Sequence, residues 1–283
     1  MPQPLIDIRS LVKTRPGGRG YRLFIPALSI GPGDFVALLG PSGSGKSTAL
    51  DLFALILRPD ECERFTLDFG ERSFDPKAAW QAGNLDNLAD IRARHFGYVL
   101  QVGGLLPFLN VRDNILLSRR VLGLAGDGPL AELAENLGIA HLLAKNIDQI
   151  SVGERQRAAI ARALCHEPAL VLADEPTSAL DPVTAQDVLN LLIATTRKQQ
   201  AALIISSHDW DLVRASNFRE LHISVNMRNE SDQAKPAPIE ARLADPAADS
   251  AEGPAAAGSA PRSASGSAPG STLDPYPDTG DPA

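Results

Sequence analysis

Residues 40–48, GPSGSGKST, combine glycine, lysine and hydroxyl side chains at a spacing suited to phosphate groups. The stretch fits the pattern G-x-x-x-x-G-K-[ST], in which the glycines let backbone N–H groups turn toward one point. Lys46 can bridge the β- and γ-phosphates of a nucleotide, and the Ser47 hydroxyl can ligate Mg²⁺. An apolar run before it and a helix-like run after it favour nucleoside triphosphate binding over a chance glycine-rich turn. The positions expected to contact the nucleotide are Gly40, Pro41, Ser42, Gly43, Ser44, Gly45, Lys46, Ser47 and Thr48.

Two acidic residues, Asp174 and Glu175, end the apolar run LVLADE. An acidic side chain in such a place is costly to bury unless a cation or hydrogen-bond partners accompany it. We expect Asp174 to hold the Mg²⁺ shell and Glu175 to polarise the water that attacks the γ-phosphate. The stretch DEPTS also resembles a strand-to-helix turn with a capping residue, but the phosphate-binding loop favours the catalytic interpretation.

His208 closes a third apolar run, IISSH, and can reach a phosphate or orient a water molecule. Its run is expected to lie beside the other two, which favours a role at the site. The other histidines are interpreted as structural or solvated.

The stretch ISVGERQR can be explained as an ordinary helix start. Ser151 suits the N-cap and Glu154 stands three residues later, which is the spacing of a capping box. A helix start can equally direct its positive end at an anion. The local pattern leaves both interpretations open.

The elements that must position these residues alternate between strand and helix patterns. The apolar runs at residues 34–40, 169–175 and 201–207 are typical of parallel strands buried on both faces. Residues 151–166 and 182–199 have helical spacing, and the alternation predicts an α/β layer fold. Residues 105–148 are mostly helical in pattern and read as a helical insertion, whereas the N-terminal stretch reads as short strands and turns.

Composition narrows the class of protein. The chain has 283 residues and 44% hydrophobic side chains, which is sufficient for a sizeable core. Cys62 and Cys165 are far apart without a metal-like spacing, so we expect a reduced, cytosolic protein. No run approaches the ~18 apolar residues of a membrane span, and no signal peptide is evident. Any membrane span is therefore expected to belong to another chain.

The C-terminal stretch differs sharply in composition. Residues 231–283 hold 35 Ala, Pro, Gly or Ser among 53 residues and carry five of the seven net negative charges. Such a segment buries too little apolar surface to offset chain entropy, so we expect it to be disordered and the folded part to end near Met227. The nearly neutral remainder lacks the basic surplus that favours nucleic acid.

The order of these motifs resembles that of the ATP-binding subunit of an ABC transporter, over about residues 5–225. GPSGSGKST resembles the Walker A motif, and FGYVLQ places Gln101 at the Q-loop glutamine. ISVGERQR stands at the signature usually written LSGGQ, and LVLADE resembles Walker B with Glu175 as the catalytic glutamate. SALD matches the D-loop, and His208 matches the switch histidine.

The resemblance implies a P-loop NTPase core with a mostly parallel sheet, an N-terminal antiparallel β part and a helical insertion. The ATP-binding domain would span residues 1–227, with a helical subdomain at about 105–166 and a disordered tail at 228–283.

The resemblance also implies a Mg²⁺-dependent ATPase that pairs head to tail with a second copy or a paralogue. Each ATP would lie between Walker A of one chain and Ser151 and Gly153 of the other. Gln101 would contact Mg²⁺ or the attacking water, where the helical insertion meets a separate transmembrane permease. The chain would then lie in the cytoplasm, on the inner face of the membrane, with no nucleic acid partner.

The sequence departs from the family pattern in two places. Val152 replaces a signature glycine and Glu154 replaces the glutamine, whose added charge could repel phosphate unless it caps its own helix. No aromatic residue stands where the family stacks adenine. Tyr21 is the nearest candidate, and it could equally pack as part of a strand.

The stretch FGYVLQVGGLLPFLNVRDNI is similar to that of lipoprotein-releasing and macrolide-efflux exporters. The alternative is an ATP-dependent regulatory module that signals through a permease-like partner without moving a solute. ABC ATPases that handle nucleic acid normally carry a coiled-coil insertion or tandem domains, and neither is present here.

Overall fold

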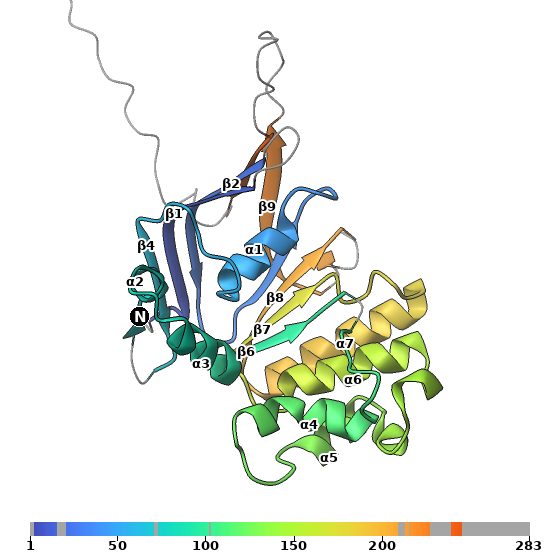
Figure 1. Ribbon diagram of the computed structural model, residues 1–283. Helices are drawn as coiled ribbons and strands as arrows, with labels where there is room; N and C mark the ends of the chain where they lie inside the picture. Colours follow the sequence, from blue (N-terminus) through green and yellow to red (C-terminus); the bar gives the residue numbers. More distant parts are fainter. Residues whose placement is uncertain are drawn as a thin grey trace, which may run out of the picture. The chain divides into compact units, whose positions relative to one another are not determined.

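A mixed sheet forms the centre of the structure, with helices against both of its faces (Figure 1). This computed structural model describes residues 3–15, 21–70, 73–101, 103–208, 213–214, 216–226 and 239–244. All of them belong to one unit that spans residues 1–251, and residues 252–283 lie outside the described part. The strand order is β5-β4-β1-β2-β10-β9-β3-β8-β7-β6.

The parallel part of the sheet, in which four strands carry candidate residues at their carboxyl ends, consists of five strands. They are β3 (Phe35–Leu39), β6 (Phe96–Val99), β7 (Leu170–Asp174), β8 (Ala202–Ser207) and β9 (Arg219–Asn226). Strand β8 lies between β3 and β7, and all three run parallel. The expected adjacency of the three apolar runs is therefore confirmed.

The N-terminal part is antiparallel, as expected, but its strands are longer than the turn-rich sequence suggested. β1 (Ile6–Arg15) pairs with β2 (Tyr21–Ile30) over nearly their full lengths, from Ile6 opposite Ile30 to Arg15 opposite Tyr21. β4 (Arg64–Asp68) and β5 (Ser73–Phe74) extend the sheet beyond β1. The cross-strand pairing decides the length because each strand satisfies the backbone groups of its neighbour.

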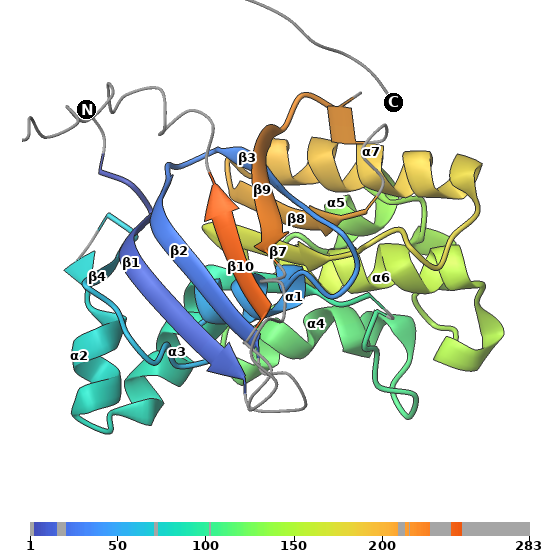
Figure 2. The same cartoon turned by 90° about the horizontal axis from the view of Figure 1, so that it is seen from above.

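A strand lies inside the segment that was expected to be disordered. β10 (Ile239–Ala244) pairs in parallel with β2 and antiparallel with β9, and so joins the two parts of the sheet (Figure 2). The alternation in IEARLA explains it, because Ala241 and Leu243 are buried while Arg242 between them is exposed. The expected end of the folded part near Met227 is therefore wrong, and the rest of the tail lies outside the described residues.

Two apolar cores flank the sheet. Alternate residues of β3 face opposite ways, with Val36 and Leu38 in one core and Ala37 and Leu39 in the other. The first core holds α1 (Lys46–Phe53), and residues of α2 (Pro76–Gln81) and α3 (Leu85–His95) pack into it. The second holds residues of α4 (Val111–Val121), α5 (Leu130–Asn136), α6 (Val152–Leu164) and α7 (Pro182–Lys198).

The helical insertion is confirmed. It comprises α4, α5 and α6 with the short 3₁₀ turns η1 (Ala140–Leu142) and η2 (Ile147–Gln149) between the last two. A glycine-containing stretch separates the first two helices, since α4 ends at Val121 and α5 begins at Leu130.

Candidate nucleotide site

The loop between β3 and α1 is shaped to receive an anion. α1 begins after Gly45, whose φ of 99° is in the left-handed region, and no side chain caps its first N–H groups. The other helices of eight or more residues have side-chain caps at their starts, from Asn84, Asn110, Ser151 and Asp181. The start of α1 therefore keeps its N–H groups and positive dipole end available for a phosphate.

Lys46 lies inside this loop and is only 5% exposed. Its Nζ donates to the carbonyl oxygens of Gly40 and Pro41, at 2.9 and 3.2 Å. The carboxylate of Glu175 lies 3.7 Å from the same Nζ, and a phosphate could take the place of that carboxylate as the charge partner of Lys46. This geometry supports the phosphate cradle expected at residues 40–48, which stays a prediction.

Tyr21 closes the loop from the side of β2. Its hydroxyl donates to the backbone oxygen of Ser44, and burial raises the pKa of the phenol to about 12. A Cβ on Gly45 would lie 1.6 Å from the Tyr21 hydroxyl, so only glycine fits under the ring. Of the two interpretations of Tyr21, these contacts favour packing against the loop over stacking on a base.

Glu175 brings the predicted catalytic residues together. Its Oε1 lies 3.7 Å from Lys46 Nζ, and its Oε2 lies 3.5 Å from His208 Nδ1. Gln101 donates from Nε2 to the same Oε2 at 3.4 Å. Glu175 has a φ of 44°, a strained conformation for a residue with a side chain. Three residues from distant parts of the chain thus meet at the carboxylate of Glu175.

Ser206 was not foreseen from the sequence. Its Oγ accepts from the Glu175 N–H at 2.8 Å and donates to Asp174 Oδ1 at 2.6 Å. The register explains the contact, because Asp174 and Ser206 stand opposite each other on β7 and β8. Only knowledge of that pairing could have identified Ser206.

Ser178 links the glutamate to the glutamine. Its Oγ accepts from Gln101 Nε2 at 3.1 Å and donates to the Glu175 carbonyl at 3.1 Å. The sequence pointed to SALD as a motif but not to this contact. Ser178 holds Gln101 near Glu175.

The start of α6 is a closed capping box. The Ser151 N–H donates to Glu154 Oε2 at 2.7 Å, and the Glu154 N–H donates to Ser151 Oγ at 3.3 Å. The Glu154 carboxylate thus turns back on its own helix, as the sequence allowed, and these hydrogen bonds lower the pKa of Glu154. No hydrogen bond or ion pair between described residues joins this helix start to the phosphate loop.

Gly153 has a packing reason to be glycine, because a Cβ there would lie 2.9 Å from the Thr184 methyl carbon on α7. The neighbouring Val152 points outward and is 53% exposed. The start of α6 therefore presents a branched apolar side chain at its surface.

The model of the ABC transporter family matches residues 25–178, which include the phosphate loop, Gln101 and Glu175. The chain belongs to the ABC transporter family. Within it, the lipoprotein-releasing system ATP-binding protein LolD of Legionella pneumophila is 38% identical over 185 residues, 64% of this chain and 78% of that protein. The macrolide export ATP-binding/permease protein MacB of Marinobacter nauticus is 35% identical over 231 residues, 79% of this chain but 34% of MacB.

Solved structures of ABC cassettes have the same fold. The dimeric post-hydrolysis state of the ATP-binding cassette MJ0796, bound to ADP and Pi, matches with a TM-score of 0.60 and 26% identity, over 77% of this chain and 93% of that one. This ABC protein is accordingly an ATPase that uses ATP with Mg²⁺. None of its helices within the described ranges is long and apolar enough to cross a bilayer.

The site fits the nucleotide and its metal. The uncapped start of α1 and the buried Lys46 suit the phosphates, and Ser47 and Asp174, the expected Mg²⁺ ligands, carry oxygen atoms of the kind that Mg²⁺ prefers. The described residues contain no group of three or more His, Cys, Asp or Glu that could hold a metal alone. A Mg²⁺ ion that arrives with ATP needs few protein ligands.

Proposed function

We propose that this chain is the ATP-hydrolysing subunit of an ABC exporter of the lipoprotein-releasing or macrolide-efflux type. It works as a head-to-tail dimer and drives a separate permease from the inner face of the membrane. The observation that carries the proposal is the meeting of Lys46, Gln101 and His208 at the carboxylate of Glu175, beside the uncapped start of α1.

Each of these residues has a distinct role. Lys46 and the N–H groups of the loop hold the phosphates, while Ser47 and Asp174 complete the Mg²⁺ shell. Glu175 polarises the attacking water, and His208 and Gln101 orient it. Without nucleotide, Glu175 neutralises Lys46 across 3.7 Å. A γ-phosphate takes over that contact with Lys46 and releases the carboxylate to a water molecule.

The start of α6 is the reason to propose a dimer. Among the described residues, no hydrogen bond or ion pair joins the start of α6 to the phosphate loop of the same chain, and we assign Ser151 and Gly153 to the ATP of a second chain. Closure around ATP and reopening after hydrolysis would provide the movement that the permease uses. This resembles the dimer reported for MJ0796 with ADP and Pi.

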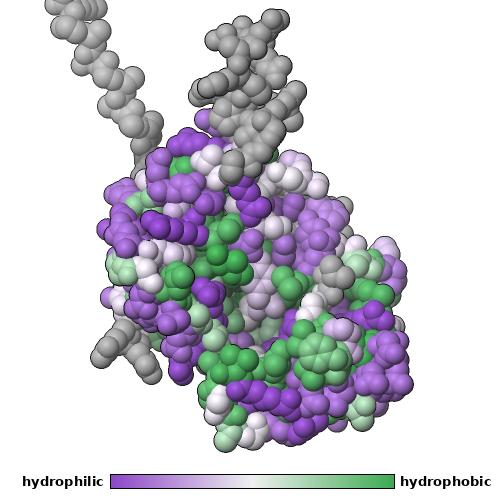
Figure 3. All heavy atoms as spheres, in the orientation of Figure 1, coloured by the Kyte–Doolittle hydropathy of each residue, from purple (hydrophilic) through white to green (hydrophobic). Residues whose placement is uncertain are grey.

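A permease needs an apolar surface on which to dock. Three large apolar side chains are exposed on α4 and on the loop between β6 and α4: Leu100, Phe108 and Val121. Phe108 is 78% exposed and Val121 is 70% exposed. Hydrophobic surface gathers over this region in Figure 3. Scattered apolar residues are ordinary on a surface, whereas a grouped set indicates an interface.

The decisive experiment replaces Glu175 by glutamine. Glu175→Gln should retain ATP binding but lower the hydrolysis rate by about a hundredfold or more, since the general base is lost. With ATP and Mg²⁺ it should elute as a dimer from a sizing column. The matched control, Glu135→Gln on the exposed side of α5, should hydrolyse ATP at the normal rate. A Glu175→Gln protein that stays monomeric and active would refute the assignment.

A further inference from the structure

Glu175 has a backbone conformation that its own sequence does not favour. Its φ of 44° lies in the left-handed region, although Glu175 carries a side chain and Pro176 follows it. A proline favours an extended conformation in the residue before it, so the sequence gives no local reason for this turn. Contacts with other residues must therefore hold the backbone that presents the Glu175 carboxylate to Lys46 and His208.

Two serine hydroxyls hold the polar backbone groups of Glu175. Ser206 Oγ accepts from the Glu175 N–H at 2.8 Å, and Ser178 Oγ donates to the Glu175 carbonyl at 3.1 Å. The Ser178 N–H also donates to that carbonyl, at 3.2 Å, so the carbonyl keeps a partner without the Ser178 hydroxyl. The Glu175 N–H has no hydrogen-bond acceptor other than Ser206 among the described residues.

The Ser206 hydroxyl has a second partner in Asp174. The same Oγ donates to Asp174 Oδ1 at 2.6 Å. A backbone N–H can only donate and an ionised carboxylate can only accept, so this one hydroxyl both accepts and donates. Ser206 is fully buried, and its removal would leave the Glu175 N–H buried without a partner.

The sheet places this serine beside the phosphate-binding helix. Asp174 and Ser206 stand opposite each other on the parallel strands β7 and β8. Leu172 and Ile204, two residues before them, belong to the core that holds α1. Because side chains alternate along a strand, Asp174 and Ser206 lie on this same face of the sheet.

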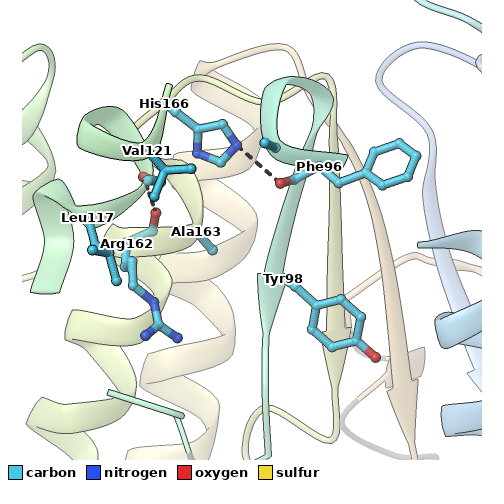
Figure 4. Close-up of a pocket in the computed structure, with 9 residues that line it drawn as sticks. Phe96, Tyr98, Leu117, Val121, Arg162, Ala163 and His166 are labelled. Atoms are coloured by element: carbon cyan, nitrogen blue, oxygen red, sulfur yellow. Dashed lines mark hydrogen bonds between the residues drawn. The ribbon is translucent and has the colours of Figure 1, made fainter. Parts of the chain in front are cut away.

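Tyr98 carries another hydroxyl on this face, but it has a different partner. Burial raises the pKa of the Tyr98 phenol, and the charges of Asp51 and Asp174 add to the effect. The Tyr98 hydroxyl donates to Asp51 Oδ1 at 3.2 Å, and Figure 4 shows it directed away from His166. Among the described residues, Ser206 is therefore the only hydrogen-bond donor to the Asp174 carboxylate.

We propose that Ser206 couples Asp174 to Glu175, so that one hydroxyl fixes both the carboxylate assigned to Mg²⁺ and the backbone of the general base. The inference rests on the proposed function, which assigns those two roles, and adds Ser206 as a positioning residue. Loss of the hydrogen-bond partner of a metal ligand typically costs about 10–100-fold in metal affinity or activity. Ser206 should therefore affect both the affinity for Mg²⁺ and the rate of hydrolysis.

The first measurement is the Mg²⁺ dependence of ATP binding in a Glu175→Gln background, which keeps the ATP intact. A fluorescent ATP analogue is titrated at a series of Mg²⁺ concentrations. Addition of Ser206→Ala should raise the Mg²⁺ concentration for half-maximal binding by about tenfold, because Asp174 is no longer held. Ser206→Thr should restore the original value, since threonine keeps the hydroxyl.

The second measurement is steady-state hydrolysis at saturating Mg²⁺. Ser206→Ala should lower kcat by about tenfold or more and leave the KM for ATP unchanged, because the Glu175 carboxylate is displaced while the phosphate contacts remain. In the Glu175→Gln background, Ser206→Ala should not lower the residual rate further, because its effect passes through the Glu175 carboxylate. Ser206→Thr should restore kcat.

Thr196→Val on α7 is the matched control. Thr196 is also fully buried, and its Oγ1 has no hydrogen-bond partner among the described residues. Its removal should change neither the Mg²⁺ dependence nor kcat. Calorimetry verifies that each variant is folded at the assay temperature. If Ser206→Ala does not fold, Ser206→Cys keeps the volume with much weaker hydrogen bonds and should show the same two losses.

Several outcomes would overturn the inference. They are a loss of only one of the two quantities in Ser206→Ala, a further fall of the residual Glu175→Gln rate, and values equal to those of Thr196→Val. The proposed function would survive each of them if Glu175→Gln is inactive and dimeric with ATP. An active, monomeric Glu175→Gln protein would instead remove the proposed role of Glu175 and the inference together.

Discussion

At the scale of single residues, the site depends on polar contacts that hold strained or charged groups. Ser206 bridges Asp174 and Glu175, and so keeps the strained Glu175 backbone in place. Tyr21 likewise positions the phosphate loop, because its hydroxyl donates to the Ser44 carbonyl. Both are positioning residues, because they act on the atoms that meet the nucleotide and not on the nucleotide itself.

The Tyr21→Phe variant distinguishes a role of Tyr21 in packing against the phosphate loop from a role in stacking on the adenine base. A phenylalanine keeps the ring but loses the hydrogen bond to the Ser44 carbonyl, which is worth about 1 kcal/mol. We therefore expect the ATP dissociation constant to rise about fivefold. Titration with a fluorescent ATP analogue measures it. Unchanged affinity in Tyr21→Phe combined with a large loss in Tyr21→Leu would instead indicate a stacking role.

At the scale of elements, β10 is the unexpected component. It fills the gap between β2 and β9 and pairs with Tyr21 through Ile239. Its loss would open two internal strand edges, and open edges are prone to pair with other chains. The C-terminal segment therefore contributes to the sheet that supports the phosphate loop.

Two truncations test the role of β10. A chain that ends after Ala244 should unfold at the normal temperature and hydrolyse ATP. A chain that ends after Ser231 loses the buried Ala241 and Leu243, at a cost of about 2–4 kcal/mol. Its unfolding temperature should fall by roughly 5–15 °C, as measured by calorimetry. Equal unfolding temperatures for both chains would show that β10 does not support the sheet.

At the scale of the whole molecule, the two copies of the proposed dimer must meet at the start of α6. Val152 is exposed there beside Gly153, and a branched side chain at this place keeps an incoming phosphate away from the helix N–H groups. The closed capping box of Ser151 and Glu154 must also open, or share its donors, when a second chain brings its ATP.

Val152→Gly should therefore raise the ATPase rate several-fold and lower the protein concentration needed for dimer formation with ATP. Val152→Ala should give an intermediate rate, because it removes the branches but keeps the Cβ. The control, Val183→Ala at the exposed start of α7, should not change the rate. Steady-state ATPase measurements over a range of protein concentrations distinguish these outcomes. Equal rates for all variants would show that valine in place of the signature glycine does not affect ATP hydrolysis.

The sequence by itself determined the phosphate loop, the order of the motifs and the α/β class. These features are local, since glycine spacing, apolar runs and capping residues act within a few positions along the chain. It also predicted roles for Lys46, Glu175 and His208, which follow apolar runs, and for Gln101 through the resemblance to the family.

Only the tertiary structure decided which of these residues touch and what supports them. Ser206 depends on the register of β7 and β8, and the packing role of Tyr21 depends on how β2 meets the phosphate loop. β10 was not predicted from the sequence, because its short alternating pattern lies in a low-complexity tail. The strand forms only between two strands that are far away in sequence.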